Sequence, residues 1–334
     1  MEKVMSRKLI TISTIMTLMS TSVMADVPNV AADIAPIHSL VSKVMDGVGE
    51  PKLVIQSGAS PHGYRLRPSE AKALQDANLI FWMGEELTPW LEGAIDTLAS
   101  NASVTALLDQ DGIVLHDFRQ GALFEAHDHD DHDDHDDHDD HDDHKDHDDH
   151  DDHDGHDDHD DHGHGAHDPH AWLSPENAKL WLNIIASKLS VADPENAASY
   201  FTNAAVGQVE IEDMVAEVSA TLKPVQGGKF VVFHDAYQYF ENDFDFYASG
   251  AISLSDASDP SPARIARIQK RIRDEGIQCV LAEPQFKQGL VATVMEGSEA
   301  TASVIDPLGA DIKPGPMLYT QLIKNMAKKI KDCL

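Results

Sequence analysis

Histidine and aspartate dominate one stretch of the chain, residues 127–170. It holds sixteen of the twenty histidines, mostly at every third position, together with 22 aspartates and one lysine. Neutral imidazole is a ligand suited to zinc, copper and nickel, and aspartate adds negative charge. The stretch has almost no apolar surface to offset the entropy cost of ordering it. We therefore expect residues 126–167 to form a disordered loop that attracts metal ions, with a solvated acidic linker as the alternative.

Three histidines, one of them the last of this stretch, stand where a fixed metal site could form. His62 shortly follows a predicted strand, His170 lies where ordered sequence resumes after the tract, and His234 directly follows a buried-strand run. Ligands of parallel α/β sheets bind outside the carboxyl ends of the strands. Three neutral imidazoles suit zinc, which accepts a water or carboxylate as its fourth ligand, whereas manganese and calcium prefer oxygen donors. One such histidine is more often structural, but the three together predict a zinc site.

Other titratable residues near these positions have competing explanations. Glu283 and Asp306 each follow a further predicted strand. Glu283 could ligate a metal, orient a histidine, or pair with a basic residue, and the last two are favoured. His38 falls inside a predicted helix, where a packed or surface role is favoured over ligation. His116 precedes the tract and could at most assist it.

The chain begins with the pattern of a cleavable signal peptide, predicted over residues 1–25. Its parts are a basic start (Lys3, Arg7, Lys8), an apolar run (9–18) and a cleavage site of small residues (23–25). The apolar run is shorter than the roughly 20 residues that a membrane span needs, and no cysteine follows it to carry a lipid. We expect a soluble exported protein with no direct membrane insertion.

Charge argues against two classes of partner. The net charge is -33, and most of it comes from the tract. Neither the tract nor the moderately acidic remainder offers the basic face that nucleic acid or an anionic membrane requires.

Only two cysteines are present, Cys279 and Cys333. In an oxidising compartment they are candidates for a disulfide, worth about 4 kcal/mol for the loop they would close. A two-thiol metal site is the alternative, although no histidine stands beside Cys279.

Short apolar runs alternate with amphipathic ones, which is typical of βα units with parallel sheets. The predicted strands are 27–32, 52–55, 78–83 and 104–108 in the first half, and 229–233, 278–282 and 302–305 in the second. The predicted helices are 34–45, 69–77, 86–98, 175–189, 194–222, 261–275, 289–295 and a last one reaching Leu334. The helix over 194–222 is long for a globular domain and suggests a strut between two lobes. The predicted division is an N-terminal lobe over 26–193, a linking helix over 194–222, and a C-terminal lobe over 223–334.

Five motifs, in order, carry a family resemblance. They are GASPHGY at 58–64, HAWLSP at 170–175, FHDAY at 233–237, AEPQF at 282–286 and DPLG at 306–309. With a His-rich insertion between the first two, the chain resembles the periplasmic zinc-binding, or solute-binding, proteins of bacterial high-affinity zinc ABC importers, in the metal-binding cluster A-I family. The similarity covers essentially the whole mature chain.

The resemblance implies an α/β fold of two Rossmann-like lobes with parallel sheets, joined by a long rigid helix, with metal in the cleft between them. By position, His62, His170 and His234 match the family's zinc ligands, and manganese-binding relatives typically have a carboxylate in place of His234. The two cysteines match a pair that forms a disulfide in the zinc branch. Some members offer a glutamate where this chain has Pro61, so we expect water as the fourth donor, with Asp306 as second choice.

The implied function is that of a receptor, not an enzyme. It would capture Zn(II) as a transported ligand and deliver it, as a monomer, to an inner-membrane ABC permease with a cytoplasmic ATPase, while the tract collects zinc near the cleft. The alternatives are a periplasmic zinc buffer or chaperone acting through the tract, a manganese-type receptor, and a secreted zinc hydrolase. The sequence has no HExxH motif and no obvious nucleophile motif, which argues against the hydrolase.

Overall fold

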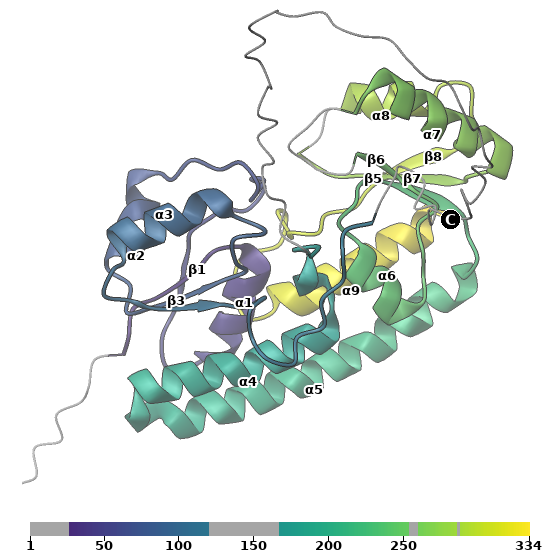
Figure 1. The fold of residues 1–334 in the computed structure, drawn as a ribbon. Helices are drawn as coiled ribbons and strands as arrows, with labels where there is room; N and C mark the ends of the chain where they lie inside the picture. Colours follow the sequence, from purple (N-terminus) through teal and green to yellow (C-terminus); the bar gives the residue numbers. More distant parts are fainter. Residues whose placement is uncertain (1–26, 120–166, 254–259, 286–287) are drawn as a thin grey trace, which may run out of the picture.

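The computed structural model describes residues 27–119, 167–253, 260–285 and 288–334. Within them the chain forms two four-stranded sheets, each covered by helices (Figure 1). The first sheet contains β1 (Val30–Ala32), β2 (Lys52–Leu53), β3 (Leu79–Trp82) and β4 (Ser103–Ala106). The second contains β5 (Phe230–His234), β6 (Ala251–Ser253), β7 (Cys279–Ala282) and β8 (Thr301–Val304). The predicted signal peptide and most of the His/Asp tract lie outside the described residues.

Both sheets have the same topology. The strand orders are β2-β1-β3-β4 and β6-β5-β7-β8, and every pairing is parallel. Their central strands β1, β3, β5 and β7 are buried along their whole length. Continuous apolar runs fit such strands because helices cover both faces of a parallel sheet. The predicted α/β class with two parallel-sheet lobes is confirmed.

Helices connect the strands and join the two lobes. In the first half they are α1 (Ala35–Val44), α2 (Pro68–Gln75), α3 (Pro89–Leu98) and α4 (Pro175–Ala192), with the 3-10 turn η1 (Ala171–Leu173) before α4. Then come η2 (Pro194–Asn196), α5 (Ala197–Leu222), η3 (Lys223–Val225), α6 (Gln238–Phe244), α7 (Pro262–Glu275), α8 (Gln288–Met295) and α9 (Leu318–Cys333). The long helix α5 runs beneath both lobes (Figure 1) and packs against α1, α4 and α9. The predicted long helix is therefore present, although it starts with a 3-10 turn.

One glycine explains how closely α5 approaches its neighbours. A Cβ on Gly207 would lie 2.9 Å from Cδ1 of Leu182 on α4 and 3.0 Å from Cγ of Lys43 on α1. Glycine weakens a helix by about 1 kcal/mol relative to alanine. Here its missing side chain lets three helices meet.

The sequence missed two short elements in the second half, α6 and β6. Both lie between predicted elements, and β6 has only three residues. Helix α4 was predicted correctly at its start, where the Ser174 hydroxyl accepts the backbone N–H of Asn177 at 3.3 Å and proline follows. Such a cap satisfies one of the backbone donors left free at a helix start.

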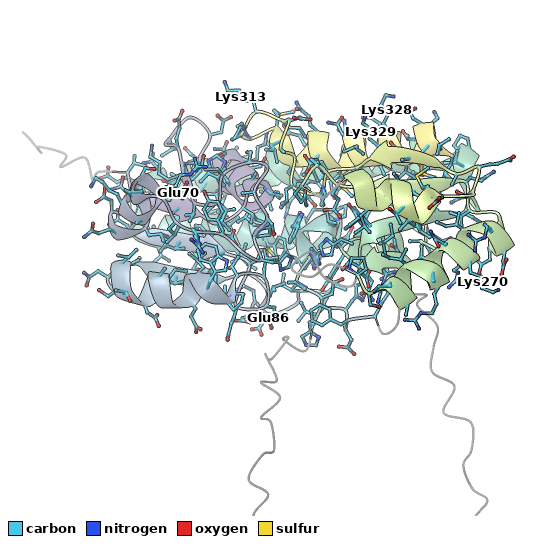
Figure 2. The ribbon with its side chains drawn as sticks, turned by 90° about the horizontal axis from the view of Figure 1, so that it is seen from above. Glu70, Glu86, Lys270, Lys313, Lys328 and Lys329 are labelled. Atoms are coloured by element: carbon cyan, nitrogen blue, oxygen red, sulfur yellow. A yellow bond between two sulfur atoms is a disulfide. The ribbon has the colours of Figure 1, made fainter. Side chains whose placement is uncertain are left out.

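The predicted disulfide between Cys279 and Cys333 is confirmed, and it joins β7 to the end of α9. Viewed from above, Glu70 and Glu86 lie on the first lobe, and Lys270, Lys328 and Lys329 lie on the second (Figure 2). Among the described residues, no helix combines the length and apolar character needed to cross a bilayer.

Candidate metal centre

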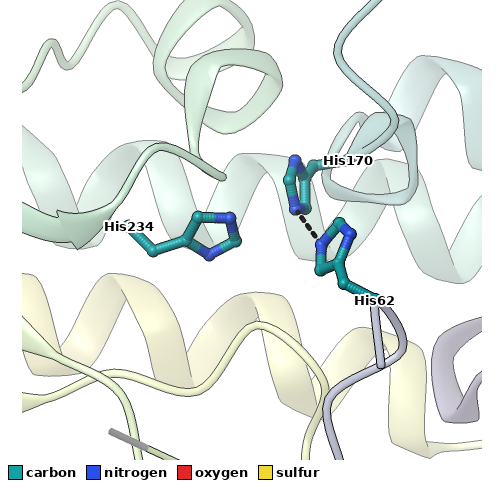
Figure 3. A group of neighbouring side chains, drawn as sticks. All are labelled: His62, His170 and His234. Atoms are coloured by element: carbon teal, nitrogen blue, oxygen red, sulfur yellow. Dashed lines mark hydrogen bonds between the residues drawn. The ribbon is translucent and has the colours of Figure 1, made fainter. Parts of the chain in front are cut away.

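His62, His170 and His234 converge from separate parts of the chain (Figure 3). Each offers one ring nitrogen, and the three nitrogens lie within 4.8 Å of one another. Zinc–imidazole bonds are about 2.0–2.1 Å long, so nitrogens this close can share one ion after small adjustments. His170 and His234 are each 4 % exposed, whereas His62 is half-buried. Two of the three side chains are therefore shielded from solvent, and His62 is partly accessible to it.

His62 comes from the loop between β2 and α2, in the first lobe. Its backbone N–H donates to the Ser60 hydroxyl at 3.3 Å. The indole N–H of Trp90, on α3, donates to the carbonyl of neighbouring Pro61 at 2.8 Å. Tyr64 donates to the buried carboxylate of Glu70 at 2.9 Å, which ties the far side of the loop to α2. Side chains of α2 and α3 thus hold this turn-rich loop in place by hydrogen bonds.

His170 stands just before η1, where the chain re-enters the described structure. Its Nδ1 lies 2.6 Å from Oδ1 of Asp168, which is 2 % exposed and also accepts the His170 backbone N–H at 3.0 Å. A proton on Nδ1 would leave Nε2 with a free lone pair, and this nitrogen is 3.4 Å from Nε2 of His62. A carboxylate behind a histidine is the usual way in which proteins fix the tautomer and ring direction of a metal ligand.

His234 is the last residue of β5, in the second lobe. Its Nδ1 lies 3.5 Å from Oε1 of Glu283, which follows the neighbouring strand β7 and is 3 % exposed. The side-chain amide of Gln285 donates to the other oxygen of Glu283 at 2.7 Å. Of the three roles considered for Glu283 from the sequence, this geometry matches a carboxylate that orients a histidine.

Burial shapes the electrostatics around these side chains. It raises the pKa of Asp168 to about 6, although the His170 backbone N–H and the positive charge of Arg119 oppose that shift. Burial also raises the pKa of Tyr237 well above its usual value, and nearby Glu283 adds to the effect. Since three neutral imidazoles bring no charge to a divalent ion, the negative charge that would balance it comes from carboxylates behind them.

Asp306, the remaining predicted site residue, lies outside the histidine group. Its Oδ1 accepts the backbone N–H groups of Leu308 at 2.9 Å and Gly309 at 3.0 Å, and its Oδ2 accepts that of Ala310. A carboxylate has about four lone-pair sites, so these bonds leave limited capacity for a metal. Asp306 thus shapes the loop between β8 and α9.

The other two histidines considered from the sequence also lie outside the group. His38 is buried in α1, with Nε2 3.2 Å from the Pro51 carbonyl oxygen. His116 packs its ring on Tyr239 and has its Nε2 3.1 Å from the Asn242 amide. Asp168, which directly follows the predicted loop, is not among the residues singled out from the sequence. Its signal is the spacing of two residues before a histidine that begins an ordered segment.

Nearly the whole chain is similar to known zinc-uptake proteins. The family described as "Zinc-uptake complex component A periplasmic" matches residues 30–333. The high-affinity zinc uptake system protein ZnuA of Brucella abortus (strain 2308) is 51 % identical over 305 residues, which is 91 % of each chain. The protein of the same name from Paracoccus denitrificans (strain Pd 1222) is 48 % identical over 311 residues, 93 % of each chain.

Solved structures share the fold. A crystal structure of ZnuA superposes with a TM-score of 0.70 at 22 % identity, over 92 % of this chain and 99 % of that one. The manganese complex of the solute-binding protein FpvC from Pseudomonas aeruginosa gives 0.72 at 16 % identity, over 92 % and 98 %. At such low sequence identity these structures show the two-lobed architecture alone. The family match over residues 30–333 and the 51 % identity show homology. The chain therefore belongs to the family of periplasmic zinc-uptake complex component A proteins.

Proposed function

We propose that this protein is the periplasmic zinc receptor of an ABC importer. It would capture Zn(II) between His62, His170 and His234 and pass the ion to an inner-membrane permease driven by a cytoplasmic ATPase. The observation that carries the proposal is the convergence of three imidazole nitrogens within 4.8 Å, two of them on buried side chains. High-affinity zinc uptake by the named relatives supports the same conclusion.

The donor set favours zinc over manganese. Three nitrogen donors and one open position match the tetrahedral preference of zinc, and manganese favours carboxylate and water oxygens. The two nearby carboxylates, Asp168 and Glu283, lie behind histidine Nδ1 atoms. They would therefore tune the ligands and leave the coordination to nitrogen.

We assign the fourth coordination position to water, with Asp306 as the second candidate. Water can reach the ion from the open side, next to half-buried His62. An Asp306→Asn variant tests the choice, because the amide oxygen keeps part of the loop hydrogen bonding and loses the anionic donor. Zinc affinity within about threefold of wild type supports water, whereas a loss of about 100-fold would assign the position to Asp306.

The His/Asp tract would act as an accessory collector. A multi-site segment tethered beside the cleft raises the local zinc concentration without forming a tight site of its own. Neutral imidazoles bind the ion, so its occupancy is expected to fall as the pH drops below about 6.5.

Competitive zinc titration at neutral pH tests the receptor proposal. The mature full chain and a variant lacking residues 126–165 are compared with a His234→Ala variant of each. One tight zinc that survives removal of the tract, disappears with His234 and resists excess manganese supports the cleft. If tight zinc disappears with the tract, the protein is a zinc buffer that acts through that segment.

A further inference from the structure

A buried cluster of three charges adjoins the metal centre and plays no part in it as described so far. The guanidinium of Arg119 donates from Nη1 to Oε2 of Glu241 at 2.6 Å and from Nε to Oδ1 of Asp235 at 3.0 Å. Its Nη2 contacts both carboxylates. The side chains of Arg119, Asp235 and Glu241 are only 15 %, 7 % and 1 % exposed. A guanidinium that bridges two carboxylates in this way uses its planar fork of donors, which lysine lacks.

The arginine belongs to the segment 107–119, called the strap below, which crosses from the first lobe to the second. After β4 the chain runs over α4, where the amide of Asn177 makes two hydrogen bonds of 2.9 Å with the backbone of Val114. The strap then meets α6, where the Tyr239 hydroxyl accepts the backbone N–H of His116 at 3.1 Å. Arg119 follows three residues later. A segment that starts in the first lobe thus places the Arg119 guanidinium against two carboxylates of the second lobe.

Both carboxylates of the cluster are close in sequence to the metal centre. Asp235 directly follows His234, and Glu241 lies on α6, the helix that begins just after this turn. Both carboxylates are buried, and Arg119 bridges them. Without the guanidinium, two buried carboxylates would face each other, and the turn that carries His234 would have to move.

The strap also reaches the other buried histidine. The backbone N–H of Asp168 donates to the His116 carbonyl at 2.8 Å, and the Tyr239 hydroxyl donates to the Asp168 carbonyl at 2.7 Å. Asp168 orients His170, so the same segment braces the supports of two of the three histidines.

We infer that Arg119 is a positioning residue of the metal centre: its guanidinium anchors the strap to Asp235 and Glu241 and thereby fixes His234 relative to His170. The inference rests on the proposed zinc-receptor function and deepens it. Arg119 acts through the turn after β5 and through the strap.

Loss of the guanidinium should weaken zinc binding more than the loss of a comparable ion pair elsewhere in the protein would. Changes to groups that orient metal ligands typically cost 10–100-fold in affinity. We expect that range for Arg119→Met, and a smaller loss for Arg119→Lys, which restores the charge without the fork. Lys43→Met is the matched control, because Lys43 pairs with Glu210 at 2.6 Å, is 12 % exposed and joins α1 to α5.

The experiment measures zinc affinity of the full chain against a chelator that keeps the weaker tract sites empty. Unfolding of the metal-free variants is followed in parallel, and the visible spectrum of each Co(II)-loaded variant reports the ligand geometry. We expect Lys43→Met to lose stability while keeping wild-type zinc affinity and cobalt bands. Arg119→Met is expected to lose affinity and to shift the bands, with partial recovery in Arg119→Lys.

Two outcomes would overturn the inference. One is wild-type affinity in Arg119→Met, and the other is an equal loss in Lys43→Met, which would make the effect one of general stability. If Arg119→Met does not fold, Arg119→Lys decides, since unchanged cobalt bands and affinity in that variant refute the need for the fork. A wild-type chain without tight zinc would refute the receptor proposal, and this result is distinct from all the others.

Discussion

The two lobes share a strand order but hold their histidines differently. In the first lobe, His62 is half-buried on a loop that follows a strand of two residues. In the second, His234 is itself the end of a five-residue buried strand and has Glu283 behind it. A disulfide further fastens the second sheet to α9. The second lobe thus presents its histidine from the end of a buried strand, and the first presents its histidine from a loop.

This difference suggests a division of labour in the cleft. A strand end fixes a side chain more closely than a loop does, and a fixed ligand loses less entropy when a metal binds. The loop ligand sits on the solvent side, where water can replace it. His234 and His170 would therefore set the affinity, while His62 would complete the site when the ion arrives and leave it first.

The largest expected effect is on the free energy of unfolding, through the disulfide of the second lobe. Cys279→Ser with Cys333→Ser opens a crosslink that spans 54 positions, and should cost about 4 kcal/mol of unfolding free energy. Zinc affinity should stay within about threefold of wild type, because Cys279 opens β7 whereas Glu283 follows its other end. Denaturant unfolding and zinc titration of the double variant check both parts. A tenfold weaker site would show that the crosslink also positions the ligands.

The next effect compares the ligands themselves. Zinc sites of four ligands are worth about 10–16 kcal/mol, so removing one buried ligand should cost about 3 kcal/mol, or roughly 100-fold in affinity. We expect this for His234→Ala and His170→Ala, and nearer tenfold for His62→Ala, where water can take the vacated position. His38→Gln is the control, because His38 is buried in α1 and lies outside the group. Equal losses at all three ligands would refute the division of labour.

The carboxylates behind the histidines should have smaller and unequal effects. Asp168→Asn and Glu283→Gln keep the size of each side chain and remove its charge, which typically costs 10–100-fold in metal affinity. We expect Asp168→Asn to have the larger effect of the two, below the loss in His170→Ala, because its oxygen is 2.6 Å from His170 Nδ1, against 3.5 Å between Glu283 and His234. Titration of both variants with zinc ranks them, and the reverse order would contradict the geometry.

The smallest effect concerns stability against pH in the first lobe. Burial lowers the pKa of His38 from its usual 6.5. The unfolded chain binds a proton more readily there, so the stability from this neutral histidine is present above pH 6.5 and is lost as the pH falls below it. His38→Gln should flatten this part of the unfolding profile of the metal-free protein and leave zinc affinity unchanged. A slope identical to wild type would show that His38 stays neutral in both states or charged in both.

The place of His62 and His234 within their own lobes could be predicted from topology. Parallel strands end at one edge of their sheet, so a residue after β2 and one at the end of β5 are each expected at the ligand-binding edge of a different sheet. How the two lobes bring these edges together is defined only by the folded chain. The repeated alternation of apolar and amphipathic runs predicted both sheets, because it is typical of βα units with parallel strands. Short elements escaped: β6 and α6 are too brief for periodicity to stand out from turns.

The supports of the site could not be predicted in the same way. Arg119 stands in a segment without periodicity. Its neighbours in the sequence give no sign of an ion pair with residues more than a hundred positions away. Asp168 is one aspartate among many. Such partners depend on how the strap crosses between lobes, which only the folded chain defines. Asp306 shows the converse, since a residue well placed in sequence is occupied with its own loop.

The long helix α5 has a consequence for how zinc capture can be observed. Its 26 residues extend about 39 Å, and it packs on helices from both lobes, so separating the lobes would break a continuous buried surface. Zinc should therefore leave the radius of gyration in X-ray scattering almost unchanged. The signal would be local: the buried indole of Trp172 lies 5.2 Å from the His170 ring, and its fluorescence emission would report the arrival of the ion.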